Sequence, residues 1–475
     1  MIEKIYDAVV IGGGVIGVSV FNTLVKSGYD AVLIEKEPDV STGTTKANSG
    51  IIHAGFDAKP GTLKAKMNVE GNAMFPGICE RLHVPLTKCG AYVIGNDESV
   101  VDELLSRAKA NGVKKMHKLG RSELKKKLPN ITDDMTYGLF AENSYIIEPY
   151  FYTICLAEEA VVNGGEIYFN YELKKVTKKK GYYIISNGKE NLYAKKIVNC
   201  AGFGYNNVAK LLKTELYNIE YRRGEYYVLD HSERDTVPAT IFPLPTKAGK
   251  GVLVTPTVSG NILVGPTSYP SDDSTCTTIE GIHDVAFKSK SMLTNVNLGK
   301  AIRIFAGVRS IVGDDFVIEN SKKDGNIINV AGICSPGLSS APAIAKYIMG
   351  LMGYEYNPTV RDKTIEPYTR LADMSDDEKN KLIKHNSDYG KIICKCENIT
   401  LGEIKDAINR PIRPQTMDGI KRRVRPGMGR CQGGFCNDKV AMILAKENNV
   451  DLSMISKEKS NGKYIAGEIS SRSVL

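Results

Sequence analysis

Four cysteines near the C-terminus are the most chemically distinctive set in this chain of 475 residues. One residue separates Cys394 from Cys396, four separate Cys431 from Cys436, and 34 lie between the two pairs. Thiolates bind soft metals, but these spacings differ from the two-residue spacing of common zinc ribbons. The glycine-rich stretch 426–436 supplies backbone N–H groups able to bond bridging sulfides. The set favours an iron–sulfur cluster, redox-active or structural, over a single zinc ion or free thiols.

A glycine-rich sequence near the N-terminus has the spacing of a dinucleotide-binding turn. Gly12 allows the tight turn, Gly14 lets the backbone approach a pyrophosphate, and Gly17 permits close packing of a helix on a strand. Glu35 follows Gly17 by eighteen positions and can accept hydrogen bonds from both ribose hydroxyls. An acid at this point favours FAD or NAD over NADP. The alternative is a purely structural glycine turn.

The elements that would hold these glycines are visible in the hydrophobic pattern. An apolar run at 7–11, a helical pattern that stops near Gly28 and a second apolar run at 31–34 predict a β-α-β unit. Because strand, glycines, helix, second strand and acid coincide, dinucleotide binding is favoured over the structural turn.

Two later segments predict further strands of the same sheet. Residues 195–204 run from a buried strand into small residues that include Ala201 and Gly202, and residues 325–332 do the same up to Gly332. The second leads into a helix whose first N–H groups, near Gly337 and Leu338, would face a cofactor ring that becomes anionic on reduction. We therefore expect these five residues to line a flavin site.

The chain is longer than a single core usually supports, and 42% hydrophobic with 25% charged residues is typical of a soluble globular protein. Strand patterns alternate in two central stretches, which predicts an antiparallel sheet inserted into the nucleotide-binding core. We expect a mixed α/β (α+β) fold with a Rossmann-like FAD-binding core and a small helical C-terminal domain. The expected boundaries are an oxidoreductase unit over 1–355 (core about 1–80, 145–215 and 300–355; substrate-domain insertions about 80–145 and 215–300), a linker over 356–388, a cluster domain over 389–445 and a tail over 446–475.

Charge and hydropathy limit the partners. Residues 410–430 carry seven Lys or Arg against one Asp, which indicates either a solvated face or a patch, including Arg422 and Arg423, that stabilises cluster thiolates or docks an acidic electron acceptor. No aromatic residues interleave with the patch, which argues against nucleic acid. No stretch of about 18 apolar residues and no signal peptide is present, so we expect a cytoplasmic protein that reaches a membrane only through a partner.

The cysteine segments carry a family resemblance. Residues 393–400 and 429–436, together with a Thr-initiated helix after the first pair, closely resemble the [2Fe–2S] domain of bacterioferritin-associated ferredoxins. The resemblance implies that Cys394, Cys396, Cys431 and Cys436 are the four cluster ligands.

A second resemblance covers roughly residues 5–350. The stretch 44–61, with its Asn-Ser-Gly-Ile-Ile-His and Lys-Pro-Gly sequences, is similar to the glycerol-3-phosphate oxidase and dehydrogenase branch of the FAD-dependent oxidoreductases (DAO superfamily), and to L-2-hydroxyglutarate oxidases. Segments 242–245, 264–267, 307–309 and 335–340 add to it. The resemblance implies that His53 lies near the flavin as the base and that Arg309 holds a substrate anion. Thr44, Asn48 and Ser49 would then pass close to the flavin.

The expected chemistry agrees with these residue types. Hydride transfer from a secondary alcohol requires the hydroxyl proton to leave, and the imidazole of His53 is suited to take it. Arg309 offers a planar fork for phosphate or carboxylate, and either Lys247 or Lys250, preferably Lys250, adds a point charge. Ser339 either donates to the substrate or flavin or caps a helix. The structural alternatives are a buried packing histidine and a surface arginine pair.

We expect a phosphate-bearing substrate, sn-glycerol 3-phosphate, to be oxidised to dihydroxyacetone phosphate, because a Lys-plus-Arg pocket suits a dianion. Electrons would leave singly through the cluster to an acceptor protein or partner subunit. The alternatives are L-2-hydroxyglutarate or another 2-hydroxy or amino acid as substrate, and a flavin and iron–sulfur redox sensor. The anion-binding residues argue against a sensor.

Overall fold

The apolar run at the N-terminus becomes the central strand of a parallel sheet. In the computed structural model, which describes residues 4–245, 251–271 and 275–465, β1 (Tyr6–Ile11) is buried on both faces. Val10 pairs in parallel with Leu33 on one side and with Val198 on the other. The strand order is β18-β19-β11-β1-β2-β8, with β10 paired to β11 and β9 paired to β10. The other strands are β2 (Ala31–Ile34), β8 (Glu166–Tyr168), β9 (Lys175–Lys179), β10 (Tyr182–Ser186), β11 (Asn191–Asn199), β18 (Val317–Asn320) and β19 (Ile327–Ala331).

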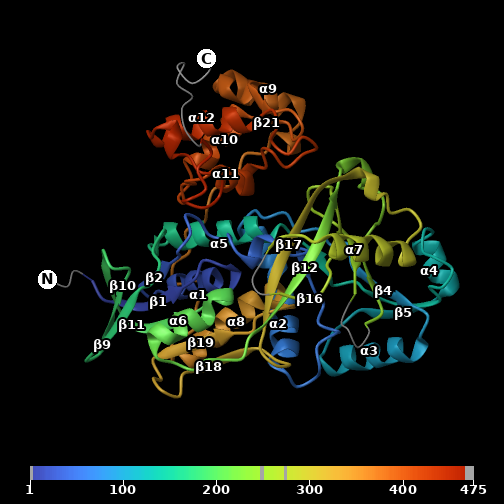
Figure 1. The fold of residues 1–475 in the computed structure, drawn as a ribbon, viewed down its shortest axis with the longest axis horizontal. Helices are drawn as coiled ribbons and strands as arrows, with labels where there is room; N and C mark the ends of the chain where they lie inside the picture. The colour runs from blue at the N-terminus through green and yellow to red at the C-terminus, as the bar shows by residue number, and fades with distance from the viewer. Residues whose placement is uncertain (1–3, 246–250, 272–274, 466–475) are drawn as a thin grey trace, which may run out of the picture.

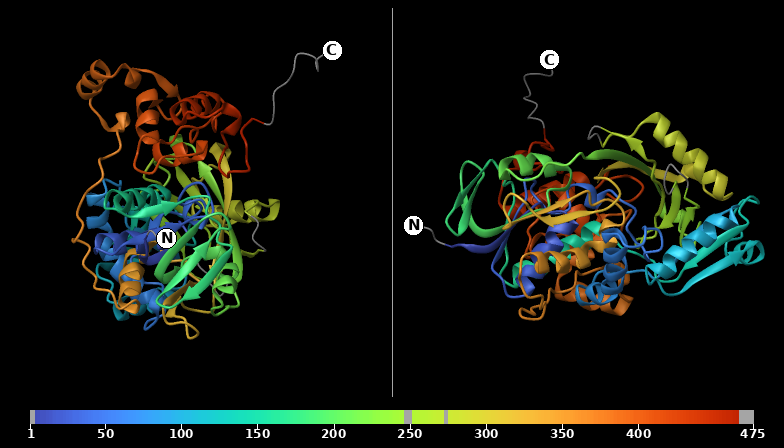
Figure 2. Two further views of the ribbon diagram at one scale, coloured as in Figure 1. Left: turned by 90° about the vertical axis from the view of Figure 1, so that its left-hand side faces the viewer. Right: turned by 90° about the horizontal axis from the view of Figure 1, so that it is seen from below.

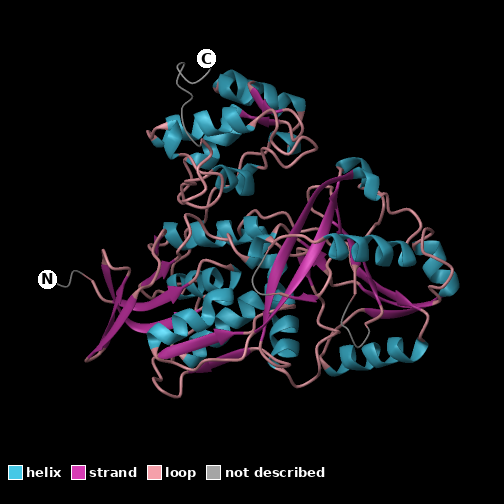
Figure 3. Ribbon diagram, viewed as in Figure 1, coloured by secondary structure: helices cyan, strands magenta, loops and turns pink. Residues whose placement is uncertain are grey.

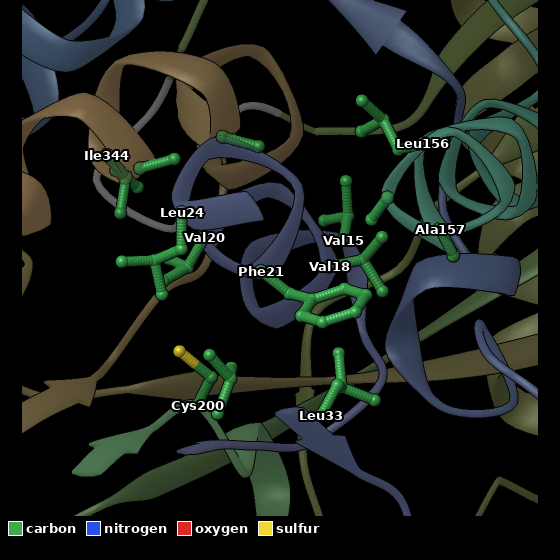
Figure 4. Packing of buried hydrophobic residues seen from close by; sticks show 14 of the residues in the cluster. Val15, Val18, Val20, Phe21, Leu24, Leu33, Leu156, Ala157, Cys200 and Ile344 are labelled. Atoms are coloured by element: carbon green, nitrogen blue, oxygen red, sulfur yellow. The ribbon is translucent and has the colours of Figure 1, made fainter. Parts of the chain in front are cut away.

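Helices cover both faces of this sheet because successive β1 residues point to opposite sides. Ala8 and Val10 pack under α1 (Val15–Lys26), α5 (Pro149–Val162) and α8 (Gly337–Leu351), where Phe21 is fully buried among Leu33, Leu156 and Ile344 (Figure 4). Val9 and Ile11 pack on the side of α6 (Tyr205–Leu212). A further helix, α2 (Leu63–Arg81), lies against α8.

A second, nine-stranded sheet is antiparallel except where β4 pairs with β13. Its order is β16-β12-β15-β14-β13-β4-β6-β5, with β17 on β12. The strands are β4 (Ala91–Gly95), β5 (Met116–Gly120), β6 (Tyr137–Ala141), β12 (Glu220–Leu229), β13 (Thr240–Pro243), β14 (Leu253–Pro256), β15 (Ile262–Gly265), β16 (Tyr269–Pro270) and β17 (Ala301–Ile311). Helices α3 (Glu98–Ala110), α4 (Arg121–Lys127) and α7 (Ile279–Met292) accompany it, and β3 (Ile51–Ile52) pairs with β7 (Tyr145–Ile146) between the sheets.

The expected fold class is confirmed: both sheets and a helical C-terminal region are present (Figure 3). One expected boundary is wrong. The segment 300–355 was expected in the nucleotide-binding core, but β17 at its start pairs with β12 in the second sheet through ten residue pairs (Figure 1). The core therefore resumes only with β18 and β19.

The C-terminal module, residues 389–465, packs around Ile404, Ile420 and Leu444, all fully buried. It contains β20 (Ile392–Cys394), β21 (Ile399–Thr400), α10 (Leu401–Ile408), α11 (Met417–Val424) and α12 (Asn437–Asn448), and α9 (Asp376–His385) precedes it. The expected tail from 446 is wrong for its described part: α12 continues to Asn448 and Ile455 is buried in the module core. Short 3-10 turns complete the chain: η1 (Thr44–Lys46), η2 (Gly202–Gly204), η3 (His231–Glu233), η4 (Leu298–Lys300), η5 (Leu371–Asp373), η6 (Ser387–Gly390) and η7 (Leu452–Met454).

The segment that leads to the module runs along the body formed by the two sheets (Figure 2). Arg361 donates to the Gly28 carbonyl at 3.1 Å, and the Lys363 N–H donates to Asn163 at 3.0 Å. No helix in the described ranges has both the length and the apolar composition needed to cross a bilayer.

Five arginines of the basic run join the module to the body; we call them the interface arginines. Arg423 binds Asp39 with two nitrogens at 2.7 and 3.1 Å, and Arg422 adds a third bond at 3.2 Å. The interface arginines bind the body as follows: Arg410 to Glu158, Arg422 and Arg423 to Asp39, Arg425 to Glu148, and Arg430 to Asp230.

Both expectations for this run, a solvated face and an acceptor-docking patch, are wrong for Arg422 and Arg423, because their side chains are only 4% and 0% exposed. Burial by itself raises the pKa of Asp39, but Arg423 and Arg422 outweigh it and hold that pKa below its usual value. The stabilisation is therefore present above the ordinary pKa of an aspartic acid and is lost as the pH falls through the lowered value.

Asp39→Asn removes the charge that compensates two buried guanidinium groups. We expect a loss of about 3–5 kcal/mol in the free energy of unfolding, since one partner of a buried ion pair is removed. Asp133→Asn is the matched control, because Asp133 is 83% exposed and faces Arg121 and Lys125 on the surface. Urea unfolding of both variants measures the difference; equal midpoints would contradict the importance of the buried pair.

Candidate functional site

A cavity of about 2090 Å³ runs from the glycine-rich turn, between the two sheets, to the C-terminal module. This volume exceeds the usual range of about 300–1,000 Å³ for small-molecule pockets, so it has room for an extended dinucleotide with a substrate beside it. The body contributes Gly14, Glu35 and His53 to its wall, and the module contributes Arg425, Met428 and Gln432. The participation of the module was not predicted from the sequence.

The glycine turn is fixed by steric limits. Gly12 has φ of +110°, and a Cβ there would lie 2.6 Å from the Cys200 carbonyl oxygen. A Cβ on Gly17 would lie 2.0 Å from the Gly12 oxygen. Gly14 differs, because the nearest atom to a Cβ at that position would be Thr45 Oγ1 at 3.4 Å. The backbone of Gly14 therefore faces the cavity rather than other protein atoms. This is the geometry that a pyrophosphate requires.

Glu35 is held at the end of β2 beside this turn. Its Oε2 accepts a hydrogen bond from the Gly13 N–H at 2.5 Å and its Oε1 accepts one from the Glu37 N–H at 3.0 Å. Each carboxylate oxygen has two acceptor positions, so one on each remains for ribose hydroxyls. Burial raises the pKa of Glu35, and the two N–H groups oppose that shift.

The segment that follows η1 lies against β17. Thr44 Oγ1 donates to the Val308 carbonyl at 2.9 Å, and a Cβ on Gly307 would lie 2.1 Å from the Ala47 oxygen. Asn48 Oδ1 accepts from the Gly50 N–H at 2.9 Å, which fixes the turn before β3. Thr44, Asn48 and Ser49 all line the cavity, as do the other predicted cofactor residues Ala201, Gly202, Gly332, Gly337 and Leu338.

One of the two predicted N–H donors at the start of α8 is already engaged. The Gly337 N–H donates to the Cys334 carbonyl at 2.6 Å, so the expectation that it stabilises an anionic ring is wrong. Leu338 lies in the first turn of α8, where N–H groups have no acceptor within the helix. Of Gly337 and Leu338, only Leu338 remains a candidate for the N–H group that was expected to stabilise an anionic cofactor ring.

His53 lines the cavity, with its ring centroid 5.8 Å from that of Phe242. Its backbone is held on both sides: the His53 N–H donates to Ser339 Oγ at 2.7 Å, and Asn68 and Asn72 donate to its carbonyl at 3.2 and 3.1 Å. Ser339 is fully buried and does not border the cavity. The expectation that Ser339 donates to substrate or flavin, or caps a helix, is wrong; its hydroxyl holds the backbone of His53, directly after β3, and donates to the Ile51 carbonyl at 3.4 Å.

Arg309 enters the cavity wall from β17, and its Nη2 donates to the Thr267 carbonyl at 2.8 Å. Among the described residues it forms no ion pair, so the alternative of a surface arginine pair finds no support there. Lys247 and Lys250 lie outside the described residues, whereas Gly251 and Val252 line the cavity directly after them.

Sequence reasoning missed Tyr226, which lines the cavity from β12. Its ring stacks on Phe305 at 4.7 Å, and its hydroxyl and that of Ser49 are 3.1 Å apart. Burial raises the pKa of Tyr226, and nearby Arg309 opposes that shift. The alternating strand pattern predicted the strand correctly but carried no signal that this hydroxyl faces a cavity.

The four C-terminal thiols form two pairs. Cys396 Sγ lies 3.5 Å from Cys431 Sγ, and Cys394 shares a hydrogen bond with Cys436 that lowers the pKa of Cys394 to about 6. No three His, Cys, Asp or Glu side chains in the described ranges converge as a single-ion site requires. Two pairs suit two metal ions with two thiolates each better than one tetrahedral zinc.

Backbone donors surround these thiols, as the glycine-rich sequence led us to expect. The backbone N–H groups of Gly433, Gly434 and Phe435 lie near the sulfur of Cys431 and help to lower its pKa, and the Gly434 N–H also donates to the Cys431 carbonyl at 3.0 Å. N–H groups near thiolates stabilise the negative charge of a cluster and set its potential. The residues present therefore fit both a dinucleotide and a two-iron cluster, at opposite sides of one domain boundary.

Comparison with known proteins agrees with this geometry. Residues 7–351 match the family model described as FAD dependent oxidoreductase, and residues 392–446 match the BFD-like [2Fe-2S] binding domain. The glycerol 3-phosphate dehydrogenase of Caloramator mitchellensis is 43% identical over 97% of this chain and 98% of its own. The glycerol 3-phosphate oxidase of Mycoplasma pneumoniae is 31% identical over 74% of this chain and 95% of its own.

A solved structure of a relative shows the same body. The dithionite-reduced L-alpha-glycerophosphate oxidase from Mycoplasma pneumoniae with FAD bound superimposes with a TM-score of 0.73 at 30% identity, covering 77% of this chain and all of the other. Both resemblances expected from the sequence are confirmed.

Gly14→Ala tests the predicted pyrophosphate contact. The new Cβ has room in the protein, so we expect the apoprotein to fold normally while FAD affinity falls at least about tenfold, because the methyl group enters the space needed for close approach. Titration of apoprotein with FAD, followed by flavin fluorescence, measures this. Gly77→Ala on α2, where a Cβ meets nothing within 4 Å, is the control; equal affinities would show that Gly14 does not contact the cofactor.

Proposed function

The chain belongs to the family of FAD-dependent oxidoreductases, and we propose that it oxidises sn-glycerol 3-phosphate to dihydroxyacetone phosphate and exports the electrons singly through its C-terminal cluster domain. One observation carries the proposal: His53 and Arg309, a base and an anion-binding fork, line the same cavity, which also reaches the thiol module. The near full-length relative named glycerol 3-phosphate dehydrogenase supports the choice of substrate.

Each residue has a defined task in this reaction. A bound flavin supplies the hydride acceptor and a bound cluster supplies a one-electron store. Arg309 binds the substrate phosphate and orients the alcohol. His53 accepts the hydroxyl proton while the C2 hydrogen leaves with its electron pair. Ser339, Asn68 and Asn72 hold the backbone of His53 so that its ring keeps one position.

The electrons leave to an external one-electron acceptor at the module surface. Cys396 is exposed, and the neighbouring Phe435 is 83% exposed, so this edge of the thiol set meets solvent. An acceptor protein or partner subunit that docks here comes close to the cluster. Arg422, Arg423 and Arg425 are excluded from that task because their side chains are buried against carboxylates of the body.

A second candidate substrate is L-2-hydroxyglutarate. The fork of Arg309 matches a carboxylate as well as a phosphate, and L-2-hydroxyglutarate dehydrogenases are 32% identical over 55% of this chain. Glycerol 3-phosphate is preferred because the relatives named for it span a larger share of the chain.

Anaerobic mixing tests the substrate. We expect millimolar glycerol 3-phosphate to bleach the flavin absorbance, and L-2-hydroxyglutarate and proline to leave it unchanged on the same time scale. Arg309→Lys should raise the concentration needed for half-maximal bleaching, since lysine keeps the charge but not the planar fork. Bleaching by L-2-hydroxyglutarate alone would replace the first candidate with the second.

His53→Ala tests the base. We expect the rate of flavin reduction by glycerol 3-phosphate to fall by about 10²–10⁴, the usual contribution of a positioned general base. His117→Ala, which changes an exposed histidine on β5 beside Glu142, should leave the rate unchanged. Stopped-flow absorbance at the flavin band measures both, and an unaffected His53→Ala variant would rule out the assignment.

A further inference from the structure

We propose that Arg425 is a positioning residue that ties the cluster loop to the wall of the flavin cavity and thereby sets the rate of electron transfer between the two centres. The inference rests on the proposed function in requiring that electrons pass from one centre to the other. It does not depend on the identity of the substrate. Arg425 is one of the interface arginines, and it differs from the other four because it joins Glu397, next to Cys396, to Glu148 in the cavity wall.

The guanidinium of Arg425 contacts both halves of the molecule at once. Its Nε donates to Glu397 Oε2 at 3.0 Å, its Nη1 to Glu148 Oε1 at 2.6 Å and its Nη2 to Asn261 Oδ1 at 3.3 Å. The side chain is 10% exposed, and those of Glu148 and Glu397 are 13% and 5% exposed. All three nitrogens of a buried fork are therefore engaged, two by the body and one by the module.

Each end of this bridge touches a redox site. Glu397 follows Cys396 directly in the chain. At the other end, Glu148 lines the cavity and follows Ile147, whose N–H donates to the Gly50 carbonyl at 2.9 Å. Gly50 opens the strand that leads to His53. Hydrogen bonds and covalent bonds thus connect the segment that carries Cys394 and Cys396 to the segment 44–61, which was expected to pass close to the flavin.

The backbone at Arg425 is held in an uncommon conformation. It ends α11 with φ of +67°, in the left-handed region that residues other than glycine seldom adopt. This turn directs the side chain back toward the body and starts the loop 426–436 that carries two of the thiols. Met428 in this loop also meets the body, where the Tyr150 hydroxyl lies 3.8 Å from its sulfur.

The electron balance is simple. Two electrons leave each substrate molecule with its hydride, and a two-iron cluster holds one of them at a time. Each must therefore pass the boundary separately, and an external one-electron acceptor must take each in turn. The distance and orientation between the flavin site and the cluster site therefore limit the rate of both electron transfers.

The test uses the holoprotein with its flavin reduced by light and a chemical donor, so that no substrate is involved. We expect Arg425→Gln to slow the subsequent reduction of the cluster, followed by its electron paramagnetic resonance signal, by about tenfold or more, because a small displacement of positioned groups has a large effect on rate. The rate of bleaching by glycerol 3-phosphate is measured in parallel and should fall by a much smaller factor, because hydride transfer does not cross the boundary between body and module.

Arg410→Gln is the matched control. Arg410 is also an interface arginine and binds Glu158 at 2.7 and 3.0 Å, but it touches neither the thiol loop nor the cavity wall. We expect its electron transfer to match that of the unmodified protein. Hydrogen–deuterium exchange of residues 389–465 should show the module still docked in both variants, because four interface arginines remain in each.

Three results would overturn the proposal: cluster reduction in Arg425→Gln at the unmodified rate, equal slowing in Arg410→Gln, or release of the module in Arg425→Gln alone. The last would make Arg425 a docking residue only. A failure of glycerol 3-phosphate to bleach the flavin, with Arg425→Gln still slow after light reduction, would instead refute the proposed substrate and leave this inference intact.

Discussion

The pairing of buried arginines with buried carboxylates across one boundary is the constraint on which the rest of the structure depends. Removing a charge from water is costly unless a partner with good geometry compensates it. Asp39 meets this requirement through two guanidinium groups, and Glu158 and Glu148 meet it through one each. The C-terminal module is therefore held in one orientation against the body, because sliding it would leave these charges unpaired.

That fixed orientation explains how a single cavity acquires walls from both parts. Steric limits at Gly12 and Gly17 form the cofactor turn, and the contact of Gly307 with Ala47 brings β17 and its Arg309 to the same space as His53. The docked module completes the wall with the loop that follows Arg425. The cavity that contains the candidate catalytic residues thus extends as far as the loop of the module that also carries Cys431 and Cys436.

Much of this was predictable where the physical cause is local. The glycines of the turn and Glu35 at the end of β2 follow from spacing, and the Thr400 start of α10 and the grouping of four cysteines in one module follow from the family resemblance. Which thiols lie together, Cys396 with Cys431 and Cys394 with Cys436, was not predicted. Contacts between distant segments were not predictable. The basic run gave no sign that its partners were Asp39 and Asp230, because a carboxylate some 200 to 380 positions away in the chain leaves no pattern in the sequence. The prediction for Ser339 was wrong for the same reason. Its residue type suggested a hydroxyl that donates to the substrate, whereas tertiary packing brings that hydroxyl to the backbone N–H of His53.

The four acidic partners of the interface arginines also bear on engineering. Asp39, Glu148, Glu158 and Asp230 all belong to the body, and they come from three separate stretches of its chain, because Glu148 directly precedes α5 and Glu158 lies within it. A designer who wished to graft this iron–sulfur module onto another flavoprotein would have to transplant those scattered carboxylates along with the donor domain, since the module supplies the cations of these bridges and the recipient must supply the acids.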